Sequence, residues 1–174
     1  MIPPSPDKQV NELHLQPGEH YFGGGRQRIH TLLGSCVAIT FWHLEKQLGG
    51  MCHYTTPTRG NKQASSLGHY ADEVILWFLE RIRENHTKPE EYQVKLFGGG
   101  TMFLRQKGTH PHFDVAGSNV LTGQELLRRQ GFLVQAADVG GGFHRRIYLE
   151  LWNGSVWLKK QKTFQLGEKP CQSR

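Results

Sequence analysis

The chain has 174 residues, of which 37% are hydrophobic and 21% charged, so it fits one domain with a single core and is not a disordered or low-complexity protein. Its formal net charge of +6 is compatible with an acidic partner, but the basic residues are scattered, which disfavours a nucleic-acid-binding module. The apolar run at residues 36–42 is too short to span a membrane, and residues 1–6 lack the apolar segment of a signal peptide.

The first half of the chain predicts strands, a hairpin and one long helix. Residues 1–17 are polar, contain prolines and show no period, so we expect a flexible N-terminal segment. A strand is predicted over residues 26–33, and a turn signal separates it from a hairpin with strands at 36–42 and 49–54. Apolar residues with helical spacing then predict a helix from residue 69 to about residue 85.

The second half continues the alternation of strands and helices. Strands are predicted at residues 92–97 and 132–137, with a second helix at 119–130 between them. Asn153-Gly154 lies between two runs of alternating hydrophobicity within residues 146–160, and this pattern is the strongest short signal for a hairpin.

This mixed order of elements predicts a single α+β domain over residues 18–160, followed by a polar C-terminal tail at 161–174. Glycine triplets begin at positions 23, 98 and 140, and none matches a phosphate-binding motif. We interpret the triplets as turns, with close approach of the backbone to a substrate as the alternative.

The candidate chemistry centres on Cys36, which follows the small residues Gly34 and Ser35 at the start of a predicted strand. A thiol attacks as the thiolate, and a nearby imidazole can take its proton and later protonate a leaving group. His53 lies at the far end of the returning strand of the same hairpin. Backbone N–H groups near Ser35 and Cys36 are candidates for holding an oxyanion.

The register of the hairpin decides whether Cys36 and His53 meet. A turn centred between Leu44 and Glu45 pairs them directly, and one centred between Glu45 and Lys46 makes them diagonal neighbours on one face. A turn centred on Glu45 places them on opposite faces. The spacing is compatible with a Cys–His pair, and the sequence leaves the register open.

Each of these residues also has an ordinary structural interpretation, because most free cysteines are small buried hydrophobes. Cys52 precedes His53, so its side chain is expected on the opposite face of the strand, in the core. Cys171 lies in the tail. Three sparse cysteines form no disulfide framework, which favours a reducing, cytoplasmic location.

A metal site is not expected. Among ten histidines, only His110 and His112 form a close pair, and the chain contains no Cys-x-x-Cys or His-Glu-x-x-His motif. Four convergent ligands cannot be identified, so we expect neither a metal nor a cofactor.

Several motifs together resemble the chemoreceptor glutamine deamidase family (CheD). They occur in the family's order between about residues 18 and 160. The Gly-Ser-Cys block followed by the Gly-Gly-Met-x-His block is the specific part of the resemblance. The motifs lie at residues 31–38, 49–53, 69–71, 95–103, 117–119, 138–141 and 145–146.

The resemblance implies a cysteine hydrolase that converts receptor glutamines to glutamates in chemotaxis adaptation, without metal or cofactor. By position, Cys36 corresponds to the nucleophile and His53 to the catalytic histidine. The family's third catalytic residue is a threonine upstream of the nucleophile; Thr31 is the nearest match, whereas an ungapped comparison places His30 there. The implied fold has mixed β-sheets packed as a sandwich with helices outside, as in bacterial toxin deamidases.

The implied partners are the cytoplasmic helices of chemoreceptors and, in some members, a CheC-type phosphatase, with no nucleic acid and no membrane insertion. We hypothesise that basic residues such as Arg128 and Arg129 meet acidic receptor helices. A non-catalytic adaptor that binds receptors or the phosphatase stays open as an alternative. A thiol protease would share the first chemical step, but no peptide-binding signature is visible.

Overall fold

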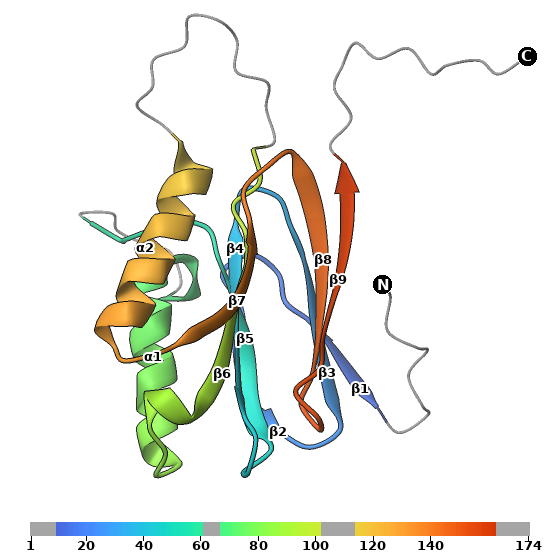
Figure 1. Cartoon of the computed structure of the whole chain (residues 1–174), viewed down its shortest axis with the longest axis vertical. Helices are drawn as coiled ribbons and strands as arrows, with labels where there is room; N and C mark the ends of the chain where they lie inside the picture. The colour runs from blue at the N-terminus through green and yellow to red at the C-terminus, as the bar shows by residue number, and fades with distance from the viewer. Residues whose placement is uncertain (1–9, 61–66, 102–113, 163–174) are drawn as a thin grey trace, which may run out of the picture.

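The computed structural model describes residues 10–60, 67–101 and 114–162, which form two β-sheets and two α-helices (Figure 1). One sheet has the order β1-β3-β8-β9, comprising β1 (Asn11–His14), β3 (Gln27–Leu33), β8 (Phe143–Glu150) and β9 (Val156–Lys162). The other has the order β2-β5-β4-β6-β7, comprising β2 (His20–Gly24), β5 (Leu48–Tyr54), β4 (Val37–His43), β6 (Tyr92–Gly98) and β7 (Val134–Val139). The helices are α1 (Ala71–Glu84) and α2 (Val115–Arg129), and short 3₁₀ turns span Leu67–His69 and Pro89–Glu91.

The two sheets pack face to face, and both helices cover the outer face of the five-stranded sheet (Figure 1). Both sheets are mixed, because β1 pairs with β3 and β6 pairs with β7 in parallel, while the other pairings are antiparallel. The predicted α+β class with a sandwich of mixed sheets is confirmed. In the part of the chain that the structure describes, the helices lie on one side only, so the outer face of the four-stranded sheet carries no helix.

Strand β4 divides the interior into two cores, because every residue in it is buried. Its alternating side chains point to opposite faces. Ile39 and Phe41 face the helices, where Phe41 stacks on Phe78 of α1 with ring centroids 4.3 Å apart. Ala38 and Trp42 face the four-stranded sheet and pack in the core between the sheets.

The structure differs from the sequence-based expectations at the N-terminus. Strand β1 lies inside the segment 1–17 that was expected to be flexible, and Leu15 is buried in the core between the sheets. Strand β2, which was not predicted, pairs with the edge of β5. Both strands are four or five residues long, so they are too short to show a clear period-2 pattern.

Two further elements have different bounds from those predicted. Helix α2 begins at Val115 rather than at residue 119, because the side chain of Asp114 accepts a hydrogen bond from Gly117 N and caps the first turn. The β8–β9 hairpin is confirmed, but its turn is longer than Asn153-Gly154: Leu149 is the last paired residue of β8, and Leu151 turns back into the core. Among the helices described, none is both long and apolar enough to cross a membrane.

Candidate active site

The register of the β4–β5 hairpin brings Cys36 and His53 to the same face. Ala38 lies opposite His53, so the turn is centred between Glu45 and Lys46, the second of the three predicted alternatives. Cys36 is therefore a diagonal neighbour of His53, and such neighbours have Cα atoms about 7–8 Å apart. This face looks into the space between the two sheets, at the end where β4 begins.

Thr31 reaches His53 from the other sheet. Its side chain on β3 points inward, and its Oγ1 lies 2.8 Å from Nδ1 of His53 and 2.7 Å from the backbone oxygen of Leu15. The carbonyl of Leu15 can only accept, so the single hydroxyl proton is donated to it and Nδ1–H of His53 donates to Oγ1. This arrangement fixes the tautomer in which Nε2 carries the free lone pair.

The free nitrogen, Nε2 of His53, is buried inside the protein. His53 is 2% exposed and Thr31 is 1% exposed, and Nε2 of His53 has no hydrogen-bond partner among the residues described. A buried polar atom without a partner is costly, and such atoms cluster where a protein keeps a group for chemistry. Nε2 is thus available to take a proton from a thiol on the same face.

Strand alternation decides between the two residues that could correspond to the third family position. His30 points to the outer face of the four-stranded sheet, where its ring stacks on His14 with centroids 4.7 Å apart. Thr31, the next residue, points inward to His53. The structure therefore brings Thr31, and not His30, to the candidate site.

Burial sets the protonation states of the pair. It lowers the pKa of His53 to about 4 and raises the pKa of the half-buried Cys36 thiol, which a hydrogen bond from the Ser35 side chain partly opposes. Near pH 7 the pair is therefore a neutral thiol and a neutral imidazole. Proton transfer from Cys36 to His53 must then accompany the attack rather than precede it.

The other described cysteine has no such environment. Cys52 lies on the opposite face of β5 from His53, as predicted, within the core between sheet and helices. Complete burial raises the pKa of its thiol to about 12, so it is a structural residue. Cys171 lies outside the described residues.

The loop Gly34–Cys36 carries the candidate nucleophile and is called the nucleophile loop below; two of its carbonyl groups face the glycine triplet at residues 98–100. The oxygen of Gly34 accepts from Gly100 N at 2.8 Å, and the oxygen of Cys36 accepts from Gly99 N at 2.9 Å. The backbone N–H groups of Ser35 and Cys36 donate to no backbone carbonyl within the described ranges. Two free N–H donors next to a nucleophile can hold the oxyanion of a tetrahedral intermediate.

Asn119 of α2 fastens this loop to the neighbouring elements. Its side chain is fully buried, and its Nδ2 donates to the oxygen of Thr55 at 2.9 Å and to that of Ser35 at 3.4 Å. The hydroxyl of Tyr54, at the end of β5, donates to the backbone oxygen of Asn119 at 2.7 Å. The 117–119 block is part of the family resemblance, but the sequence indicates no role for Asn119, because only the fold brings it to residue 35.

The second glycine triplet packs against the nucleophile loop. Gly98 has φ of +118°, and a Cβ at this position would lie 2.1 Å from the backbone oxygen of Cys36. Gly99 also has a positive φ, of +61°. These glycines therefore make both a turn and a close approach, and the backbone that they approach is that of Cys36.

Arg145 is a second buried residue without a predicted role. Its guanidinium donates to Asp138 Oδ1 at 2.8 Å and to the backbone oxygen of Gly140 at 2.7 Å. It thereby fixes the turn between β7 and β8, where Gly141 accepts from Thr101 N. Asp138, Gly140 and Arg145, which are far from Cys36 in sequence, thus stabilise the end of the molecule that carries it.

Metal ligands do not gather in the described part of the chain, where no group of three or more His, Cys, Asp or Glu side chains could hold an ion. The pair His110 and His112 lies outside the described residues. The arrangement of Thr31, His53 and Cys36 is compatible with a thiol nucleophile and an oriented base.

Comparisons with known proteins identify relatives along most of the chain. Residues 55–160 match the family model described as "CheD chemotactic sensory transduction", a range that begins two residues after His53. The chain is 45% identical over 150 residues, 86% of this chain and 89% of the relative, to a protein of Pseudomonas syringae pv. tomato named "Probable chemoreceptor glutamine deamidase CheD". A relative in Dechloromonas aromatica with the same description, numbered CheD 3, is 40% identical over 86% of this chain and 88% of the relative. A relative in Leptospira interrogans, numbered CheD 1, is 39% identical over 87% of this chain and 93% of the relative.

Proposed function

The chain belongs to the CheD family, and from this premise we propose that it is a protein-glutamine deamidase that converts specific glutamines of chemoreceptors to glutamate, with a role in chemotaxis adaptation. The observation that carries the mechanism is the hydrogen bond from His53 Nδ1 to Thr31, which leaves Nε2 free on the face that Cys36 shares. Cys36 is the nucleophile, His53 the general base and acid, and Thr31 the residue that orients His53.

In the first half of the reaction, Cys36 Sγ attacks the side-chain amide carbon of the glutamine while His53 Nε2 takes the thiol proton. The carbonyl oxygen becomes an oxyanion, which the N–H groups of Ser35 and Cys36 hold. The imidazolium then gives its proton to the amide nitrogen, the C–N bond breaks, and ammonia leaves. Since burial disfavours the charged form of His53, the imidazolium is short-lived and a strong acid toward the leaving group.

In the second half, water attacks the thioester carbon and His53 Nε2 takes its proton. The same N–H pair holds the second oxyanion. Collapse of the intermediate breaks the C–S bond, the thiolate regains its proton from His53, and the product is a carboxylic acid, which ionises to glutamate by releasing its proton to ammonia or water. Atoms and charge balance without a metal or cofactor.

The proposal also assigns partners. The substrate is a folded receptor with glutamines on cytoplasmic helices, so the protein acts in the cytoplasm, and a CheC-type phosphatase is a further partner. A product glutamate carries a negative charge that the glutamine lacked, and it is a site that can be methylated. The reaction therefore links this enzyme to receptor adaptation.

Release of ammonia tests the proposal. Wild-type protein incubated with the cytoplasmic fragment of a chemoreceptor should release ammonia, and Cys36→Ser and His53→Gln should not. Release that survives Cys36→Ser would remove Cys36 as the nucleophile. Tight binding of the fragment by wild type without any release would favour the non-catalytic adaptor.

A further inference from the structure

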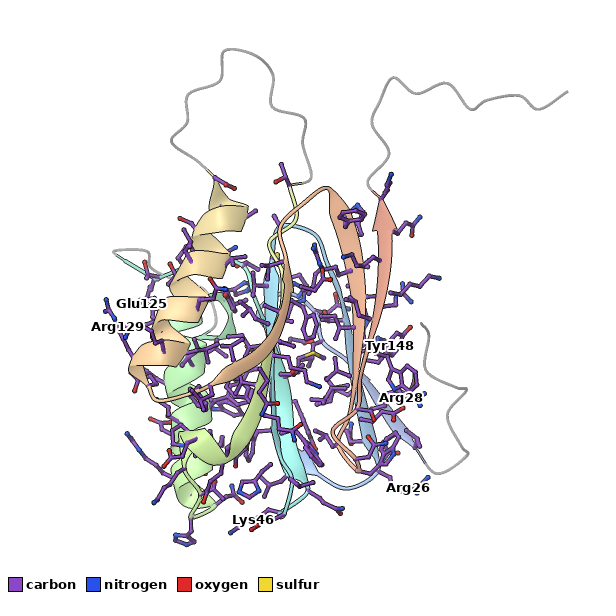
Figure 2. The ribbon with its side chains drawn as sticks, viewed as in Figure 1. Arg26, Arg28, Lys46, Glu125, Arg129 and Tyr148 are labelled. Atoms are coloured by element: carbon purple, nitrogen blue, oxygen red, sulfur yellow. The ribbon has the colours of Figure 1, made fainter. Side chains whose placement is uncertain are left out.

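The outer face of the four-stranded sheet carries basic side chains on β8 and β9, beside an exposed leucine on β3. Leu32 on β3 lies opposite Arg146 on β8, and Arg146 lies opposite Lys159 on β9. Tyr148, two residues along β8 from Arg146, points the same way, and Figure 2 shows it on the side of the sheet away from the helices. No described helix covers this face (Figure 1).

The neighbouring pair of basic residues on β8 and β9 has an acidic partner, which Arg146 and Lys159 lack among the described residues. Arg145 and Lys160 also lie opposite each other, and both reach Asp138, each at 2.8 Å. Arg146 and Lys159 form no ion pair with any residue that the structure describes. Like charges placed directly opposite on a sheet repel, so this second pair is unfavourable until an anion joins it.

The unpaired cations line a hollow of about 540 Å³ together with Leu32, His144 and Tyr148. The residues that line it include no aspartate or glutamate. Leu32 is 49% exposed, so the hollow combines positive charge with exposed apolar surface. At the other end of the same face the charges are matched, because Arg28 pairs with both Glu12 and Glu150.

This hollow lies close to the candidate active site. Leu32 precedes Cys36 by four residues, so an extended chain limits the distance between their Cα atoms to about 14 Å. Strand β3 presents Thr31 to His53 on its inner face and Leu32 to the hollow on its outer face. A protein segment seated in the hollow can therefore present a neighbouring side chain at the end of the sandwich where Cys36 lies.

We propose that this hollow is the docking surface for an acidic segment of the substrate protein, whose carboxylates pair with Arg146 and Lys159 while its apolar side chains cover Leu32 and Tyr148. The inference rests on the proposed deamidase function, because it assigns the segment to the substrate. It replaces the hypothesis that Arg128 and Arg129 form the receptor-binding surface.

The structure gives Arg128 and Arg129 a different place. Both already pair with Glu125, at 2.9 and 2.7 Å. They lie in the last turn of α2, on the helix side of the molecule (Figure 2), whereas the first turn of α2 packs against Gly99 near the nucleophile loop. Substitutions at Arg128 and Arg129 thus provide a matched control, because these residues lie at the opposite end of α2 from the nucleophile loop.

The test compares two double variants of the full chain in a Cys36→Ala background. Arg146→Glu with Lys159→Glu and Arg128→Glu with Arg129→Glu change the net charge equally. Affinity for the receptor cytoplasmic fragment is measured by fluorescence anisotropy at several salt concentrations. We expect the first variant to bind about tenfold or more weakly, with a flatter salt dependence, and the control to stay within about twofold of the parent.

The same substitutions in the active protein separate docking from catalysis. Arg146→Glu with Lys159→Glu should raise KM for the fragment, leave kcat unchanged, and leave the rate of Cys36 alkylation by iodoacetamide unchanged. Equal affinity of the two double variants for the receptor fragment would overturn the proposal. So would loss of binding to anionic phospholipid vesicles with receptor binding intact, because the surface would then meet lipid. Charge-dependent binding of the fragment without deamidation by wild type would support the docking surface while refuting the proposed function.

Discussion

Replacement of Thr31 by valine removes one hydroxyl and keeps the shape of the side chain. In the structure this hydroxyl satisfies two buried groups at once, the carbonyl of Leu15 and Nδ1–H of His53. Valine removes this bridge, so each group loses its hydrogen bond to the hydroxyl. The imidazole is then free to move its proton from Nδ1 to Nε2, and the Nε2–H tautomer cannot take a proton from Cys36.

The size of the effect follows from the cost of the lost hydrogen bonds. A buried polar group without a partner costs about 1–3 kcal/mol, so Thr31→Val should lower the free energy of unfolding by roughly 2 kcal/mol. A shift of the tautomer equilibrium by about 1.4–2.7 kcal/mol corresponds to a 10- to 100-fold fall in the fraction of competent His53. We therefore expect kcat to fall about 10- to 100-fold, with a smaller change in KM.

The assay is ammonia release from a receptor fragment at pH 7.5, with folding checked by urea denaturation. Thr31→Ser keeps the hydroxyl and serves as the control, with kcat expected within about threefold of wild type. Thr31→Val with wild-type kcat would refute the assignment of Thr31 as the residue that orients His53. An equal loss in Thr31→Ser would point to packing rather than to the hydrogen bond.

Three further predictions concern pH, Asn119 and Gly98. Burial lowers the pKa of His53 from 6.5 to about 4, so its contribution to the free energy of unfolding is full above pH 6.5 and falls by up to about 3 kcal/mol as pH falls from 6.5 to 4. Urea denaturation should therefore show a flatter pH dependence of the unfolding free energy for His53→Gln than for wild type. The same pH dependence in both proteins would contradict the assignment. Asn119→Ala removes both bonds from its amide and should cost about 2–3 kcal/mol of unfolding free energy and lower kcat roughly tenfold; a variant that loses stability but keeps full kcat would show that Asn119 does not position the nucleophile loop. Gly98→Ala places a Cβ 2.1 Å from the oxygen of Cys36 and should slow alkylation or turnover of Cys36 far more than Gly142→Ala, whose Cβ meets nothing within 4 Å; equal rates for the two variants would refute the close approach.

Local signals in the sequence predicted most of the strands and both helices. Strand β4 is a run of β-branched and aromatic residues, β6 alternates and α1 has helical spacing. The observed bounds of these elements and of β5 lie within two residues of the predicted ones. Strands β1 and β2 were missed because each is short and gains its stability from pairing with β3 or β5, which are distant in sequence. Contacts of this kind leave no periodic trace in a short segment.

The candidate site was predictable in its members but not in its geometry. Cys36 and His53 could be picked out from residue type and spacing, while the register that makes them diagonal neighbours is decided by a turn with no Gly or Pro at its centre. The bond from His53 to Thr31 crosses between two sheets, so periodicity alone cannot predict it. Strand alternation nevertheless distinguishes Thr31 from His30 as soon as the inner face of β3 is known.

Asn119 and Arg145 show a limit of a different kind. Both are buried polar residues that satisfy backbone oxygens in loops far away in sequence. Nothing in residue type or spacing indicates which carbonyl such a side chain will reach. The only sequence signal for Asn119 and Arg145 was that they lie within the blocks that resemble the family. The structure explains their presence there by the hydrogen bonds that they donate to these backbone oxygens.

Peptide-mapped mass spectrometry of a receptor cytoplasmic fragment, treated in water enriched in ¹⁸O, tests the central claim most directly. Hydrolysis of a thioester on Cys36 predicts a gain of about 3 Da at defined glutamines in enriched water and about 1 Da in ordinary water. Both gains should be absent with Cys36→Ala and with His53→Ala. The same gains at the same glutamines with Cys36→Ala would contradict thiol catalysis by this residue.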